Sequence, residues 1–235
     1  MTADKKNTRY LKARLLGLLN RDDVEKSLDE IGRLPPGKAL NSLLTFFYHT
    51  DERVRWHAIT AAGRMVEVLA AENLEAARVF MRRLMWNLND ESGGIGWGSP
   101  EAMGEIMARQ SMLAKEFAHI LVSYIRPEAN FIEYEALQRG VLWGLGRLAR
   151  VRPTLLDDVP LLLSPFLAAT DVIVRGTAVW TAGSLDIRVT RERLIRLTDD
   201  PGSVRIYLDG CFVDTSVGLL AREAMDVRKP AEESP

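Results

Sequence analysis

Hydrophobic residues recur at spacings of three and four along almost the whole chain, a pattern that predicts amphipathic helices. Between Asp22 and Arg33, for example, Val24, Leu28 and Ile31 fall on one helical face. The predicted helices cover about residues 10–19, 22–33, 38–48, 52–69, 73–89, 99–109, 111–125, 132–150, 153–168 and 172–186. Short connections join them, so we expect the helices to pack as antiparallel pairs.

One segment of the chain occurs twice with the same spacing. Residues 51–63 and 171–183 share Asp, Val, Arg, Ala, Ala and Gly at matched positions. Weaker copies end at Gly104 and Gly146. The glycines that close the four copies therefore lie about 40 residues apart, the period of two-helix solenoid repeats.

Each shared residue type predicts a structural role. Asp51 and Asp171 can cap the helices that follow them. Small residues such as Ala58 and Gly63 allow neighbouring helices to approach closely, and the arginine can reach an acid on the adjacent repeat. The two weaker copies lack the aspartate and the arginine, so we expect any ladder of such pairs to be interrupted there.

The motif D-x-x-V-R-x-x-A-x-x-x-A-G resembles the second helix of HEAT repeats, including the short HEAT-like repeats of phycobiliprotein bilin lyases. The resemblance covers about residues 37–186. It implies an all-α fold, an α-α superhelix of the HEAT-like solenoid type with four paired repeats.

The C-terminal part departs from the repeat. Residues 204–208 and 211–213 flank Asp209-Gly210 and predict a small β-hairpin, although a fifth repeat is the alternative. Thr215 or Ser216 can then cap a last helix that runs from Val217 to Met225. The predicted organisation is one HEAT-like domain over residues 1–226, followed by a flexible tail. Its parts are N-terminal helices (8–34), repeats (37–186), a hairpin-plus-helix cap (190–226) and the tail (227–235).

Composition narrows the functional classes. Hydrophobic residues make up 47% and charged residues 27% of the chain, which is typical of a soluble globular protein. The net charge of −1 argues against a general nucleic-acid binder. The chain has one cysteine, Cys211, and we expect neither a signal peptide nor a membrane span, so the predicted location is cytoplasmic.

The sequence contains no recognisable catalytic motif, and we predict no catalytic residue, cofactor or metal site. His49, His57 and His119 lack the spacing of metal ligands. We expect His57 to be a solvated side chain. A stretch of arginines, Arg139, Arg147, Arg150 and Arg152, is expected to form a solvated helix face.

A glycine-rich segment, residues 90–98, lies where the repeat predicts the first turns of a helix. It carries Asp90, Glu91 and Trp97, and Ser99-Pro100-Glu101 then starts a helix with serine as the expected cap. One interpretation is a tolerated irregularity of the repeat. The other is a binding loop that forms one edge of a partner site.

Repeat register places further candidates on the inner helices. Glu101, Trp143 and Trp180 fall in one column, where the tryptophans are either interface anchors or core residues. Arg64, Glu105 and Arg147 alternate in sign in the next column, which indicates ion pairs between repeats.

These features predict a non-enzymatic helical-repeat scaffold that binds a partner protein through its concave face and the loop at residues 90–98. The candidate partner-binding residues are Asp90, Glu91, Trp97, Glu101, Trp143, Arg147 and Trp180. Two alternatives stay open: a HEAT-like DNA glycosylase, and a lyase or chaperone for a tetrapyrrole-bearing protein. The sequence leaves the partner and the oligomeric state undetermined.

Overall fold

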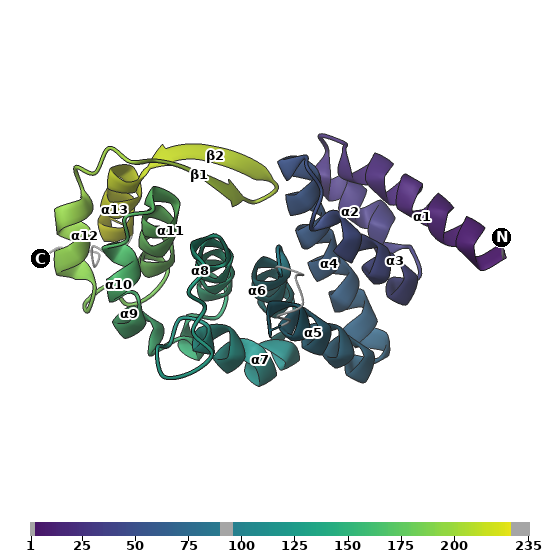
Figure 1. Cartoon of the computed structure of the whole chain (residues 1–235), viewed down its shortest axis with the longest axis horizontal. Helices are drawn as coiled ribbons and strands as arrows, with labels where there is room; N and C mark the ends of the chain where they lie inside the picture. The colour runs from purple at the N-terminus through teal and green to yellow at the C-terminus, as the bar shows by residue number, and fades with distance from the viewer. Residues whose placement is uncertain (1–2, 90–95, 227–235) are drawn as a thin grey trace, which may run out of the picture. The chain divides into compact units, whose positions relative to one another are not determined.

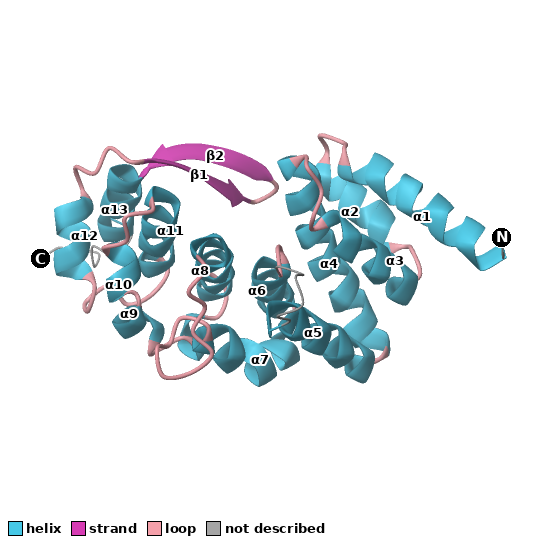
Figure 2. Cartoon of the chain, viewed as in Figure 1, coloured by secondary structure: helices cyan, strands magenta, loops and turns pink. Residues whose placement is uncertain are grey.

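A computed structural model describes residues 3–89 and 96–226 of the chain. These residues form helices joined by short loops and one antiparallel pair of strands (Figures 1 and 2). The chain divides into two compact units, Met1–Lys115 and Glu116–Pro235, which are described one at a time below. The predicted tail at 227–235 lies outside the described residues.

Unit 1 is built around one long helix, α4, which packs against α2, α3, α5 and α6. Its buried face includes Val54, Ala58 and Met65, each without exposed surface, as the hydrophobic period predicts. The elements of this unit are α1 (Ala3–Leu19), α2 (Val24–Gly32), α3 (Pro36–Leu43), the 3₁₀ turn η1 (Leu44–Phe46), α4 (Glu52–Glu72), α5 (Leu74–Asn89) and α6 (Ser99–Arg109).

The prediction that His57 is solvated is wrong. The side chain is only 4% exposed, and its Nδ1 lies 2.7 Å from the carbonyl oxygen of Leu19, the last residue of α1. A carbonyl oxygen only accepts hydrogen bonds, so Nδ1 carries the proton. His57 thus provides a donor for one of the carbonyls that the end of a helix leaves without an intrahelical partner.

A chain of ion pairs links three helices of unit 1. Arg64 of α4 lies near Asp29 of α2 (3.9 Å) and Glu67 (3.1 Å). Arg109 of α6 in turn lies 3.8 Å from Glu67 and 2.6 Å from Glu105. Arg64 and Glu105, which the repeat register places in one column, are therefore connected only through Glu67 and Arg109, two residues outside that column.

The absence of a side chain at Gly63 lets Glu105 and Arg109 of α6 pack against α4. A Cβ added at Gly63 would lie 2.6 Å from the Cγ of Glu105 and 3.3 Å from the Cδ of Arg109. We expect Gly63→Ala to lower the free energy of unfolding by roughly 1–2 kcal/mol, because overpacking outweighs the higher helix propensity of alanine. Urea denaturation measures this change.

Gly17 provides the matched control, since a Cβ there meets no atom within 4 Å. Gly17→Ala should raise the free energy of unfolding by roughly 0.5–1 kcal/mol, because alanine loses less backbone entropy in a helix. Equal effects of the two substitutions would contradict the close approach at Gly63.

Unit 2 pairs α8 with α11 and α11 with α13. The boundary between the units falls within α7 (Ser111–Ser123). The remaining elements are α8 (Glu135–Ala149), the 3₁₀ turn η2 (Pro153–Leu155), α9 (Val159–Leu162), α10 (Ser164–Leu167), α11 (Val172–Gly183), α12 (Arg191–Leu197), β1 (Ser203–Leu208), β2 (Cys211–Ser216) and α13 (Val217–Asp226).

The single helix predicted at 153–168 is wrong. The structure has η2, α9 and α10 in its place. Pro160 and Pro165 each occupy the first turn of a short helix. Proline there removes a backbone donor and crowds the preceding turn, so each proline starts a new helix instead of continuing the old one.

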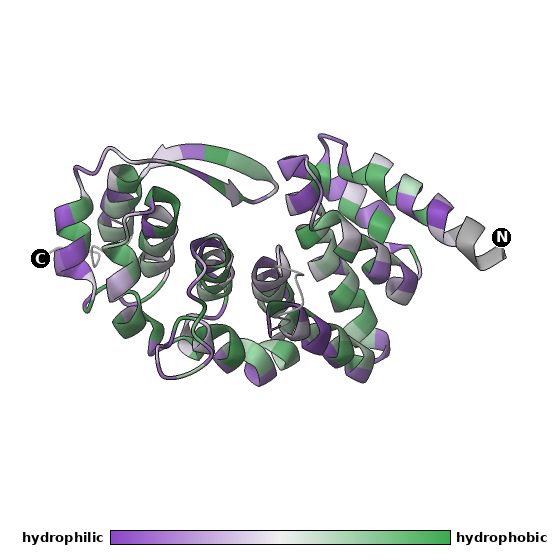
Figure 3. Cartoon of the chain, in the orientation of Figure 1, coloured by the Kyte–Doolittle hydropathy of each residue, from purple (hydrophilic) through white to green (hydrophobic). Residues whose placement is uncertain are grey.

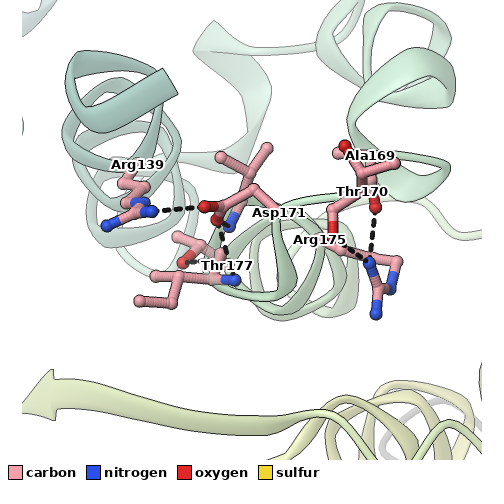
Figure 4. Close-up of polar contacts among 8 residues, drawn as sticks. Arg139, Ala169, Thr170, Asp171, Arg175 and Thr177 are labelled. Atoms are coloured by element: carbon pink, nitrogen blue, oxygen red, sulfur yellow. Dashed lines mark hydrogen bonds and ion pairs between the residues drawn. The ribbon is translucent and has the colours of Figure 1, made fainter.

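The repeated motif performs the same local task in both units. Asp51 accepts hydrogen bonds from the N–H groups of Arg53 and Val54, and Asp171 accepts them from Ile173 and Val174, so both predicted caps are confirmed. Arg55 donates to the carbonyl of His49, and Arg175 donates to the carbonyls of Ala169 and Thr170 (Figure 4). Each arginine therefore stabilises the loop before its own helix by hydrogen bonds to backbone carbonyls of that loop.

Arg175 also forms the predicted pair with an acid beyond its own helix, 2.8 Å from Asp200. This hydrogen bond lowers the pKa of Asp200. Figure 4 shows a second contact, from Arg139 of α8 to the capping carboxylate of Asp171. Burial acts to raise the pKa of Asp171, but the hydrogen bonds from Arg139 and from backbone N–H groups lower it overall. Arg139 is therefore a structural link and not part of a solvated face.

The predicted hairpin is confirmed. Strands β1 and β2 pair in register from Ser203–Ser216 to Leu208–Cys211. Asp209 and Gly210 both have positive φ, 47° and 89°, as a type I′ turn requires. Ser216 Oγ accepts a hydrogen bond from the N–H of Leu219 and so caps α13.

Candidate functional site

The predicted partner-binding residues fall in different parts of the chain. Trp97 and Glu101 belong to unit 1, whereas Trp143, Arg147 and Trp180 belong to unit 2. Asp90 and Glu91 lie outside the described residues. The two groups are therefore described separately.

In unit 1, Gly98 sets the geometry of the α6 N-terminus. Its φ of 74° is left-handed, and a Cβ there would lie 3.0 Å from atoms of the Phe47 side chain. Gly98, not Ser99, occupies the cap position, and no side chain caps the helix there. The predicted serine cap is therefore wrong, because the helix starts one residue earlier than the Ser-Pro-Glu signal suggests. The neighbouring Trp97 is 37% exposed.

Glu101 lies in the first turn of α6 with one carboxylate oxygen, Oε2, buried and without a hydrogen-bond partner. Burial raises its pKa to about 7, and the nearby Arg55 opposes this shift only in part. The Glu101 side chain is half-buried, and an unsatisfied Oε2 disfavours the charged carboxylate. It can also accept a hydrogen bond or a positive charge brought by a partner.

Glu101 predicts a pH dependence of stability. Because its pKa is raised in the folded state, stability falls as pH increases from about 4.5 towards about 7. We expect Glu101→Gln to raise the free energy of unfolding at pH 8 by roughly 1–3 kcal/mol and to change it little at pH 4. Denaturant melts at both pH values measure the difference. An equal effect at both would contradict a buried, titrating carboxyl group.

In unit 2, the predicted adjacency of Trp143 and Trp180 is confirmed. The rings stack with centroids 6.3 Å apart at an angle of 22°. Trp143 Nε1 donates to the carbonyl oxygen of Tyr207 in β1 at 2.9 Å. Trp143 is 6% and Trp180 8% exposed, so both are covered, as the core alternative requires.

Trp180 nevertheless reaches the surface at one edge, where it lines a cleft of about 430 Å³. The cleft lies among α8, α11 and α13. Its lining comprises Ala149, Arg150, Pro153, Trp180, Gly183, Ser184, Leu220, Glu223 and Ala224. The centre of the Arg150 guanidinium lies 5.9 Å from the centroid of the Trp180 ring, within the range of a cation–π contact.

Two exposed side chains of opposite charge, Arg150 and Glu223, line this cleft. Within the described part of the chain, neither forms an ion pair. An aromatic edge flanked by a cation and an anion that form no ion pair among the described residues suits recognition of charged side chains. The sequence indicated Arg150 only as one of several arginines, and it gave no signal for Glu223, which comes from the C-terminal cap.

Within residues 3–89 and 96–226, no group of three or more His, Cys, Asp and Glu side chains is arranged to hold a metal ion. None of the described helices combines the length and the hydropathy needed to cross a membrane.

No protein-family model matches the chain. An uncharacterized protein of Archaeoglobus fulgidus is 33% identical over 111 residues, which are 47% of this chain and 54% of that protein. The chain therefore spans about half the length of the curated relative that it matches.

Among solved structures, an engineered protein is 15% identical and superposes with a TM-score of 0.50 over 92% of this chain and 95% of its own. A designed armadillo repeat protein is 14% identical with a TM-score of 0.47, over 91% and 98%. Paired helices, the repeated capping motif and the first of these superpositions agree: the chain has a helical-repeat fold with a small two-stranded sheet near its C-terminus.

Proposed function

We propose that this protein is a non-enzymatic helical-repeat scaffold that binds a partner protein. The observation that carries the proposal is the cleft at Trp180, where the charged groups of Arg150 and Glu223 form no ion pair among the described residues. Such a site suits a protein segment with an apolar side chain between charged ones. In unit 1, partially exposed Trp97 and Glu101 are proposed as a second contact, together with Asp90 and Glu91, which lie outside the described residues. In unit 2, Arg147 is proposed as a separate contact.

The chemistry of the cleft explains how it would select a partner. An apolar side chain can pack on the edge of Trp180 and on Leu220, while charged neighbours reach Arg150 and Glu223. Charge pairs at the rim of an interface contribute more to orientation than to affinity, and the buried apolar contact supplies most of the affinity. We also propose a cytoplasmic location, which the free thiol of Cys211 supports.

Site-specific photo-cross-linking tests the proposal. A photoreactive residue at Ser184, in the cleft, or at Trp97 should cross-link to a discrete protein in an extract of the cells that make the chain. Arg150→Glu together with Glu223→Lys should reduce the yield at Ser184 about tenfold, because each reversed charge repels the group that it attracted.

The matched control is Arg196→Glu, which reverses an exposed charge on α12 that lies outside the cleft lining. It should leave the cross-link yield unchanged. A cross-link that forms equally well from Arg196 and Ser184, or that survives reversal of both cleft charges, would contradict the proposal.

A further inference from the structure

The two edges of the hairpin differ in how they are used. On the outer edge of β1, the carbonyl of Tyr207 accepts a hydrogen bond from Trp143 Nε1. A Cβ at Gly176 of α11 would collide with Val204, so β1 also packs directly on a helix. The edge of β1 is therefore occupied at Tyr207 by the indole of Trp143.

The register of the hairpin shows which backbone N–H and C=O groups of β2 point away from β1. In a hairpin with a two-residue turn, Leu208 and Cys211 form a hydrogen-bonded pair, and such pairs alternate with non-bonded ones. The N–H and C=O groups of Phe212 and Asp214 consequently point away from β1. Within residues 3–89 and 96–226, these groups have no backbone partner.

Edge strands are protected by charged side chains, of which Asp214 is one here, and by a bulge, a proline or a lysine. Strand β2 pairs without a break in register, and its sequence, Cys-Phe-Val-Asp-Thr-Ser, contains neither residue. Half-buried Phe212 and exposed Val213 make its first half hydrophobic, and the charged Asp214 follows. The ribbon of β2 accordingly changes from hydrophobic near the turn to hydrophilic farther along the strand (Figure 3). The edge is regular, partly apolar and open to another strand.

Strand β1 shows which side chains fit against β2. Arg205 lies opposite Asp214, Ile206 opposite Val213 and Tyr207 opposite Phe212. The Arg205 guanidinium lies 3.6 Å from the Asp214 carboxylate, and the Tyr207 and Phe212 rings meet edge to face at 5.3 Å. A strand with the same order of side chains on the free edge would repeat these cross-strand contacts.

A second copy of the chain fits less well. Antiparallel pairing of β2 with itself about Val213 would place Phe212 beside the carboxylate of Asp214 twice, and pairing about Asp214 would oppose two negative charges. Charge complementarity therefore favours a different sequence with a basic residue opposite Asp214.

We propose that the free edge of β2 binds an extended segment of a protein partner by strand addition, with a basic, a β-branched and an aromatic residue in succession. The segment runs antiparallel to β2, so that its basic residue meets Asp214 and its aromatic residue meets Phe212. This proposal is independent of the Trp180 cleft, because it follows from the register of the hairpin.

A fluorescent peptide with the sequence Ser-Val-Arg-Ile-Tyr-Leu, which repeats residues 203–208, provides the probe. Its anisotropy should rise saturably on titration with the full chain. Asp214→Pro removes an outward N–H without touching the β1–β2 ladder and should weaken binding about tenfold or more, whereas Asp214→Asn, which keeps the N–H, should weaken it only a few-fold. The indole N–H resonance of Trp143 reports whether the hairpin is still in place.

The peptide supplies a test that does not depend on the folding of a variant. N-methylation of its tyrosine removes an N–H that points towards β2 and should abolish binding, whereas N-methylation of its isoleucine should leave binding intact. Equal binding of the two methylated peptides, absence of saturable binding to the wild-type chain, or a dimer that Asp214→Pro dissociates would overturn the proposal.

Discussion

Replacement of Trp180 by alanine should lower the free energy of unfolding of unit 2 by about 3–5 kcal/mol. The ring is 8% exposed, stacks on Trp143 and lies beneath the Arg150 guanidinium, so its removal leaves a cavity and deletes an aromatic pair. Urea denaturation followed by far-ultraviolet circular dichroism measures the change.

Trp86 provides the matched control for this loss. It is 74% exposed on α5, so Trp86→Ala should change the free energy of unfolding by less than about 0.5 kcal/mol. A Trp180→Ala variant that unfolds at the same urea concentration as Trp86→Ala would show that Trp180 is not part of a packed core.

Gly146→Ala should be the next most damaging change, with a loss of about 1–3 kcal/mol. A Cβ at this position would collide with the Trp180 ring and lie 2.8 Å from the Oγ of Thr181. Thr181 in turn donates to the carbonyl of Leu142, so α8 and α11 are in close contact here and cannot simply move apart. Urea denaturation of the variant measures the loss.

A double-mutant cycle separates this collision from other effects. In a chain that already carries Trp180→Ala, the ring that the new methyl group would strike is gone, so Gly146→Ala should cost at least 1 kcal/mol less, a rough estimate for contacting sites. Additive losses from the two substitutions would contradict direct contact between Gly146 and Trp180.

Three local signals in the sequence predict structure that the fold confirms. Asp51, Asp171 and the Asp209-Gly210 turn each act through neighbours a few residues away, and the structure confirms all three. The hydrophobic period of 153–168 predicts one helix, but Pro160 and Pro165 each lie in the first turn of a new short helix, because the backbone constraint of proline prevails there.

Features that depend on distant segments could not be predicted in this way. His57 is buried because the end of α1, 38 residues earlier, needs a donor. Trp143 is covered because Tyr207, 64 residues later, accepts from its indole. Glu223 lines the Trp180 cleft only because α13 packs on α11. The repeat register predicts contacts only at positions that recur in several repeats. The C-terminal cap occurs once, so the register cannot predict its contacts.

Hydrogen–deuterium exchange of the full chain, alone and with the protein captured by cross-linking, tests partner binding at the Trp180 cleft most directly. We expect slower amide exchange in the segments that line the cleft, 149–153, 180–184 and 220–224, because a bound segment excludes water and suppresses local opening there. Protection that leaves these three segments unchanged, while other parts of the chain become protected, would contradict partner binding at this cleft.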